Sequence, residues 1–228
     1  CPGKTVNNSK GGAVLLKSPT LVSDIVSSVR AAVPNRTPVT AKIRLGFEER
    51  NLYLDNAHAI TEAGANELCV HARSKVDGYK PPAYWKCIAE IVDAINIPVV
   101  ANGEIWNIRD WQQCKDESGC ADFMVGRGLV ACPDLALQIK AHHEQSEYQP
   151  MVWSDILILL NRFYYDTKDA YPLRFLGNRV KQWLFYLQMH YPEAIPFFEK
   201  IKRYKQPHEF EAILGKKMAI GEGIRLSG

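Results

Sequence analysis

The sequence lacks a run of about 18 consecutive apolar residues, the length that a helix needs to cross a membrane. Its six cysteines include no CxxC pair, and its six histidines do not fall at the spacings of zinc ligands relative to those cysteines. The adjacent pair His142–His143 is therefore interpreted as a solvated helix end rather than as a metal site. These absences predict a cytoplasmic protein with reduced thiols, no membrane span and no bound metal.

Extremes of composition are missing as well. Of the 228 residues, 46% are hydrophobic and 23% are charged, which excludes collagen-like, low-complexity and disordered classes. Charge is nevertheless unevenly placed, because residues 1–150 hold 16 basic and 17 acidic side chains whereas residues 151–228 hold 12 and 8. The basic C-terminal third predicts an anionic partner.

Short apolar runs alternate with amphipathic segments through the first two-thirds of the chain. The apolar runs predict strands at 39–45, 67–71, 97–101 and 121–125. Helices are predicted at 52–64, 84–95 and 107–117, with one more opened by Ser18-Pro19 and another after Pro133. Such repeats are typical of a parallel sheet in the α/β class. From the pattern alone, a barrel, a Rossmann sheet and a flavodoxin-like sheet all remain open.

The pattern changes to helices alone after Pro150. Residues 153–165, 173–190 and 194–204 have helical spacing, with no predicted strand between them. One apolar stripe in the second segment comprises Val180, Trp183, Leu184 and Leu187. We therefore predict a small helical domain that follows the sheet.

Each predicted strand is followed by polar or glycine residues that a buried strand has no packing reason to carry. These segments are KIRLG at 42–46, VHAR at 70–73, ANGE at 101–104 and VGRG at 125–128. In parallel α/β folds, the loops after the carboxyl ends of the strands form the ligand site. Four polar strand ends in succession therefore predict a shared binding site.

The last two of these segments are suited to a phosphate group. Glycine lets backbone N–H groups approach phosphate oxygens, and Arg127 can add a charge-assisted pair. Ordinary turns between strand and helix are the alternative. Lys42 and Arg44 alternate on one strand, so both side chains point to the same face, where a cation can hold an electron-rich ring or an oxyanion. His71 ends the next strand in the same way, although any one of the three can equally form a strand-end salt bridge.

Five segments, in this order and spacing, resemble the tRNA-dihydrouridine synthase family: CPGKTVNNSKGG, KIRLG, VHAR, ANGEIW and VGRG. The resemblance covers residues 1–214, and the later half is most similar to the bacterial C-type enzymes, which implies uridine 16 of tRNA as the target. It implies an α/β fold made of the C-terminal half of an FMN-binding TIM (β/α)8 barrel followed by a small all-α domain. We accordingly expect a catalytic domain at 1–148 and a helical tRNA-binding domain at 149–228, the latter ending in a loose tail.

The resemblance also implies the reaction, which is reduction of the C5=C6 bond of a tRNA D-loop uridine by FMN that NADPH has reduced. Cys1 is implied as the catalytic residue that donates a proton to C5. The residues implied to bind FMN are Lys42, His71, Asn102, Gly103, Glu104, Gly126 and Arg127. Candidate contacts to uracil are Arg44 and Tyr79, and candidate contacts to the tRNA backbone are Arg174, Arg179, Lys181, Lys200, Lys202, Arg203 and Lys205. We expect the protein to be a monomer.

Other hypotheses fit less of the sequence. An N-terminal nucleophile hydrolase would use Cys1 and its α-amine, but that chemistry usually occurs on stacked antiparallel sheets. A phosphate-binding barrel enzyme, such as an isomerase or a small-molecule flavin reductase, does not predict the basic helical segment. A non-catalytic RNA-binding fragment stays open, because the family's strands before the cysteine are absent and four strands do not close an eight-stranded barrel. We therefore expect these 228 residues alone to bind FMN poorly and to expose an apolar sheet edge.

Overall fold

The structure, a computed structural model, describes residues 3–172 and 175–218. The chain divides into two compact units, Cys1–Gly126 and Arg127–Gly228. The predicted boundary between residues 148 and 149 falls inside the second unit, so a tRNA-binding domain with those bounds stays a prediction. The tail predicted at the C-terminus lies outside the described residues.

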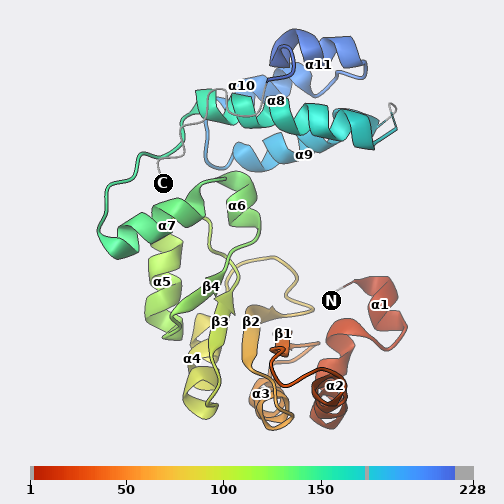
Figure 1. The fold of residues 1–228 in the computed structure, drawn as a ribbon, viewed down its shortest axis with the longest axis vertical. Helices are drawn as coiled ribbons and strands as arrows, with labels where there is room; N and C mark the ends of the chain where they lie inside the picture. Colours follow the sequence, from red (N-terminus) through yellow and green to blue (C-terminus); the bar gives the residue numbers. More distant parts are fainter. Residues whose placement is uncertain (1–2, 173–174, 219–228) are drawn as a thin grey trace. The chain divides into compact units, whose positions relative to one another are not determined.

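The first unit is built on a parallel sheet of four strands in the order β1-β2-β3-β4. The strands are β1 (Thr40–Gly46), β2 (Glu67–Ser74), β3 (Val99–Asn102) and β4 (Asp122–Met124). The four predicted strands and the α/β class are thus confirmed. Four successive strands lie side by side in chain order, with helices along one side of the sheet (Figure 1), an order that (β/α)8 barrels also have. In the doubly wound alternatives the strand order reverses and helices cover both faces.

The helical elements of the first unit are α1 (Lys4–Asn8), the 3₁₀ helix η1 (Gly12–Lys17), α2 (Pro19–Ala32), α3 (Tyr53–Glu62), α4 (Trp85–Ala94) and α5 (Ile108–Ser118). Two of them, α2 and α5, begin at a residue whose side chain caps the helix. The hydroxyl of Ser18 accepts a hydrogen bond from the backbone N–H of Leu21, and Pro19 occupies the first turn of α2. The Asn107 side chain caps α5 in the same way, accepting from the backbone N–H of Asp110 at 2.9 Å. The short elements α1 and η1 were not predicted.

The two faces of the sheet differ in chemistry. Successive residues of a strand point to opposite faces, and residues in register on neighbouring parallel strands share a face. One face carries Leu68, Val70 and Ala101, which are fully buried. The other face carries the polar or thiol side chains of Lys42, Arg44, Cys69, His71 and Asn102. One face of the sheet is therefore apolar, and the other face carries the polar side chains at the ends of the strands.

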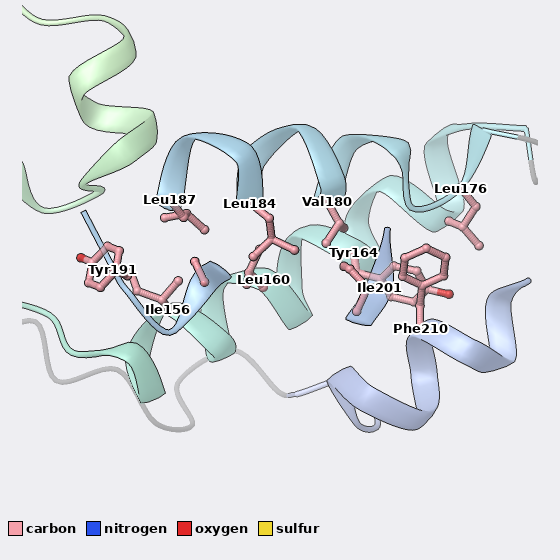
Figure 2. Close-up of a cluster of buried hydrophobic side chains, with 11 residues drawn as sticks. Ile156, Leu160, Tyr164, Leu176, Val180, Leu184, Leu187, Tyr191, Ile201 and Phe210 are labelled. Atoms are coloured by element: carbon pink, nitrogen blue, oxygen red, sulfur yellow. The ribbon is translucent and has the colours of Figure 1, made fainter. Parts of the chain in front are cut away.

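The second unit consists of helices among its described residues. They are α6 (Arg127–Ala131), α7 (Leu135–Glu144), α8 (Trp153–Ala170), α9 (Asn178–Leu187), α10 (Ala194–Ile201) and α11 (Pro207–Leu214). The helices α8, α9, α10 and α11 share a cluster of buried apolar side chains, as Figure 2 shows for Leu160 of α8 and Leu184 of α9. Three of the four residues predicted as an apolar stripe, Val180, Leu184 and Leu187, are fully buried in this cluster. The fourth, Trp183, is partly buried and donates a hydrogen bond to the Val130 carbonyl at 2.9 Å.

Helix α9 begins at Asn178, later than the helix predicted from residue 173. Gly177 precedes it with φ +78°, a left-handed conformation that favours glycine. A Cβ at Gly177 would lie 2.1 Å from Cζ of Phe210, so the position also needs glycine for packing. The helices α6 and α11 were not predicted, and the predicted helix at 194–204 ends earlier, at Ile201.

Candidate functional site

Polar side chains gather at the carboxyl ends of β1, β2 and β3. The buried members of this group, each at most 9% exposed, are Arg44, His71, Arg73, Ser74 and Asn102. Burial of polar groups costs free energy unless they are hydrogen-bonded or paired. Their concentration at one edge of the sheet therefore marks the candidate site that the strand ends predicted.

Lys42 and Asn102 contact each other at the centre of this edge. Nζ of Lys42 donates a hydrogen bond to Oδ1 of Asn102 at 2.8 Å, reaching across β2 because β1 and β3 are not neighbours. Nδ2 of Asn102 donates to the Met124 carbonyl at 2.6 Å, which turns the amide oxygen toward the lysine. Burial lowers the pKa of Lys42, and the nearby Arg44 guanidinium adds to this effect, while Cys69 opposes it.

Cys69 lies beside Lys42 on the same face, in register with it on β2. Its side chain is 3% exposed, and its Sγ lies 3.6 Å from Sδ of Met124. Burial raises the pKa of Cys69, so the thiol is neutral near pH 7. Sequence reasoning missed this neighbour, because a buried cysteine in an apolar strand reads as a small hydrophobic residue.

Arg44, His71 and Tyr79 form a second group at the same edge. The Arg44 guanidinium donates to the carbonyls of Ser74 at 2.7 Å and Gly78 at 3.0 Å, and its Cζ lies 5.3 Å from the centroid of the Tyr79 ring. The rings of His71 and Tyr79 meet edge to face at 6.2 Å. Tyr79 is 55% exposed, so its ring retains surface for a further contact. Burial lowers the pKa of Arg44, and Tyr79 opposes that effect.

The segment Asn102-Gly103-Glu104 turns sharply after β3. Gly103 has φ +118° and Glu104 has φ +57°, so two successive residues have positive φ. The carbonyl of Gly103 accepts a hydrogen bond from Nε1 of Trp85 at 3.0 Å. A Cβ on Gly103 would lie 3.5 Å from Nε2 of His71, which brings this turn close to the second group.

Arg73 and Glu104 form a buried ion pair behind this turn. Nη1 of Arg73 lies 3.0 Å from Oε1 of Glu104, and the Arg73 side chain is completely buried. Nε of Arg73 donates to the Pro82 carbonyl at 3.0 Å, and Nε1 of Trp106 donates to Oε2 of Glu104 at 3.3 Å. Sequence reasoning included Arg73 in the VHAR segment without assigning it a role, and its strand-end position was the only signal.

Gly126 and Arg127 lie where the two units meet along the chain. Gly126 ends the first unit, and Arg127 begins the second as the first residue of α6. A Cβ at Gly126 would meet no described atom within 4 Å, so packing does not require glycine there. The predicted phosphate role of this pair stays a prediction.

The basic residues predicted to contact RNA differ in their surroundings. Arg179 is exposed, with its Cζ 5.4 Å from the centroid of the Tyr171 ring. Lys181 is partly buried and donates to the Tyr204 carbonyl at 2.6 Å, and burial lowers its pKa. The exposed basic residues around the end of α10 are Lys200, Lys202, Arg203 and Lys205, of which Lys202 pairs with Glu199. Cys1 and Arg174 lie outside the described residues.

Two further searches cover residues 3–172 and 175–218. Within those ranges, no helix has the length and apolar character to span a bilayer. Nor do three or more His, Cys, Asp or Glu side chains of those ranges form a group that could hold a metal ion. The candidate site itself presents ammonium, guanidinium, imidazole, amide and backbone groups, which are suited to a polar organic ligand.

Comparison with known proteins finds one matching family. Residues 1–219 match the family described as dihydrouridine synthase (Dus). A protein from Pseudomonas putida named tRNA-dihydrouridine(16) synthase is 47% identical over 222 residues, which are 97% of this chain and 69% of that protein. Proteins with the same name from Shewanella oneidensis and Haemophilus influenzae are 47% and 40% identical, over 94% and 95% of this chain and 66% and 69% of their own lengths.

Proposed function

Because this chain belongs to the dihydrouridine synthase family, we propose that it takes part in reducing a uridine of tRNA to 5,6-dihydrouridine, with FMN as cofactor and NADPH as reductant. The relatives' name favours uridine 16 as the target. The observation that carries the proposal is the Lys42–Asn102 pair at the carboxyl end of a parallel sheet. An exposed ammonium fixed by the amide of a buried asparagine at this place is suited to an electron-rich ring.

The residues present fit FMN. Lys42 supplies a positive charge, Asn102 and Gly103 supply amide groups, and His71 lies within reach of Gly103. Gly126 and Arg127 would hold the phosphate, since an arginine fork matches phosphate oxygens. Held by these residues, reduced FMN would supply the hydride chemistry that reduction of uracil needs. Lys42 would stabilise negative charge on the ring from its position beside Asn102.

Reduction of the C5=C6 bond needs a proton at C5 as well as a hydride at C6. We propose Cys1 as the proton donor, since an ordinary cysteine thiol is mostly protonated at neutral pH. Arg44 and Tyr79 would contact the uracil. Tyr79 is exposed enough to stack, and Arg44 already contacts its ring. The target base must leave its stack to reach this edge, which costs a few kcal/mol that contacts to the rest of the tRNA must offset.

Those contacts are assigned to the helical region at residues 149–228. Its exposed basic side chains near the end of α10 are suited to phosphate groups of RNA. We propose that residues 1–148 supply the C-terminal half of a (β/α)8 barrel, since the four strands lie in chain order with helices along one side. The exposed apolar side chains of Leu21, Ile25 and Val29 on α2, each at least 42% exposed, support a further packing partner for that helix.

The test is formation of dihydrouridine on an unmodified tRNA transcript with FMN and NADPH. The protein is isolated with any sequence that naturally flanks residues 1–228, and the product is located by mass spectrometry of nuclease fragments. We expect product at uridine 16, with turnover lost in Lys42→Met and Cys1→Ala and retained in Lys86→Met, which alters an exposed lysine of α4. Undiminished turnover in Cys1→Ala would remove Cys1 as the proton donor. Tight tRNA binding without product would instead favour the non-catalytic RNA-binding alternative.

A further inference from the structure

Arg73 is the largest fully buried side chain of the described residues, and it is the penultimate residue of β2, two residues after His71. Its guanidinium connects two separate loops at the carboxyl edge of the sheet. Nε donates to the carbonyl of Pro82 in the loop after β2, and Nη1 pairs with Glu104 in the turn after β3. Its Nη2 is buried and has no hydrogen-bond partner in the part of the chain that the structure describes. Arg73 therefore depends on Glu104 for its compensating charge.

Glu104 is held in a conformation that side-chain-bearing residues rarely adopt. Its φ of +57° directly follows a φ of +118° at Gly103, so the turn needs support from its surroundings. Both carboxylate oxygens have partners within the protein, since Oε1 contacts Arg73 and Oε2 accepts from Nε1 of Trp106. The neighbouring carbonyl of Gly103 is fixed by Trp85. Both carboxylate oxygens are thus engaged within the protein, while 17% of the side chain remains exposed.

We infer that Arg73 is a positioning residue, which through Glu104 holds the left-handed turn after β3 and so sets where Asn102 and Gly103 face the cofactor. The inference rests on the proposed function, because the ligand it serves is FMN. It also reassigns Glu104, whose carboxylate supports Arg73 while its backbone belongs to the binding turn. Asn102 connects this turn to Lys42, so a displaced turn would also move the amide that fixes the lysine.

Arginine is required here for a geometric reason. Its planar fork presents Nε and Nη1 in fixed directions, so one side chain reaches both Pro82 and Glu104. A lysine carries the same charge at a single point and cannot make both contacts at once. Removal of one partner of a buried ion pair leaves the other charge uncompensated. Arg73→Lys and Glu104→Gln therefore disturb the turn in different ways while keeping similar side-chain volumes.

The test measures the turn and the cofactor separately in the native protein. Hydrogen exchange at backbone amides 103–105, read without FMN, reports the order of the turn. The dissociation constant of FMN, read from quenching of its fluorescence, reports binding. We expect Arg73→Met to speed exchange at 103–105 and to weaken FMN binding about tenfold, as supporting residues of a binding site typically do. Arg73→Lys should fall between Arg73→Met and the unaltered protein.

The matched control is Arg50→Met, which removes an ion pair of the same 3.0 Å length between Arg50 and Asp77, where the Arg50 side chain is 35% exposed. It should change neither readout. The double variant Arg73→Met/Glu104→Gln should weaken FMN binding no more than either single variant, because both act through one turn. Multiplied effects would mean that Glu104 contacts FMN directly, and would overturn the inference. Unchanged exchange in Arg73→Met would overturn it as well. Failure of the unaltered protein to bind FMN would overturn the proposed function instead, while the exchange result would still decide the role of Arg73.

Discussion

Buried polar residues are used differently in the two units. Of the ten buried polar or charged residues among those described, eight lie in the first unit and two in the second. Five of the eight stand at the carboxyl ends of β1 to β3, at the edge where we propose the cofactor. The cluster of buried side chains contributed by α8, α9, α10 and α11 consists of apolar and tyrosine residues. The first unit thus concentrates its buried polar side chains at the edge where we propose a ligand, whereas the second unit buries few of them.

The two buried polar residues of the second unit join segments of chain. Nδ2 of Asn161 donates to the carbonyls of Leu214 and Lys216, which fixes the end of α11 onto α8. Oδ2 of Asp134 accepts from the backbone N–H of Met151 at 2.9 Å and from the Tyr148 hydroxyl at 3.2 Å. Asp134 thereby holds the segment between α7 and α8. Neither residue belongs to a group of charges comparable to that around Lys42.

The largest expected effect tests the apolar core. Leu184→Ala should lower the free energy of unfolding by about 2–5 kcal/mol, because it removes a fully buried leucine and leaves a cavity between α8 and α9. Phe185→Ala is the matched control, since Phe185 is the next residue and is 61% exposed. It should change stability by less than about 0.5 kcal/mol. Urea unfolding measures both, and equal losses would contradict the core shown in Figure 2.

A somewhat smaller effect tests the hydrogen bonds by which Asp134 holds the segment between α7 and α8. Asp134→Ala should cost about 1–3 kcal/mol, because it leaves the buried N–H of Met151 and the Tyr148 hydroxyl without their acceptor. Asp155→Ala removes a carboxylate that accepts one exposed backbone N–H, from Val152, and should cost about 0.5 kcal/mol. Unfolding in urea again provides the comparison. If Asp155→Ala loses as much unfolding free energy as Asp134→Ala, burial of the hydrogen bonds to Asp134 adds nothing to stability.

The fold was predictable where apolar runs and amphipathic segments repeat along the chain. The strands and the helices between them follow from apolar runs and caps such as Ser18 and Asn107. The elements that were missed are short or lack a clear period. Helix α1 has five residues with the sequence KTVNN, and α6 has five that include a glycine. Periodicity needs more than one turn to register, so contacts with the rest of the unit decide such segments.

The candidate site was predictable only in part. Lys42, His71 and Asn102 were expected to meet, because the carboxyl ends of parallel strands share one edge. The ion pair of Arg73 with Glu104 and the position of Cys69 beside Lys42 were not predicted. Arg73 and Glu104 are 31 positions apart, and their pairing depends on the path of the loops between them. A pattern of residue types does not specify that path. The roles of Cys1 and of the basic residues remain predictions.

Buried thiols in both units make the free energy of unfolding depend on pH. Burial raises the pKa of Cys132 to about 12, with Asp134 adding to the effect, and burial raises that of Cys114 in the first unit to about 12. An unfolded thiol ionises from pH 9 upward while the folded thiol stays neutral, so stability is fully present below pH 9 and is lost as pH rises toward 12. At pH 10 each thiol should account for about 1 kcal/mol of that loss. Cys132→Ser and Cys114→Ser should each flatten the fall in urea-unfolding stability between pH 8 and pH 10, and an unchanged slope in either variant would contradict the raised pKa of that thiol.

The smallest expected change in stability belongs to the residue with the largest proposed role. Burial lowers the pKa of Lys42, so its ammonium carries a penalty in the folded state that weakens as pH rises from the folded pKa toward 10.5. Lys42→Met removes that penalty but also the hydrogen bond to Asn102, so at pH 7 stability should rise or stay within about 1 kcal/mol of the unaltered protein. FMN binding should nevertheless be lost, whereas Lys86→Met should alter neither property. A loss of several kcal/mol of unfolding free energy in Lys42→Met would instead make Lys42 a structural residue. The proposed difference between the two units, in which the polar groups of the first serve a ligand, would then be contradicted at Lys42.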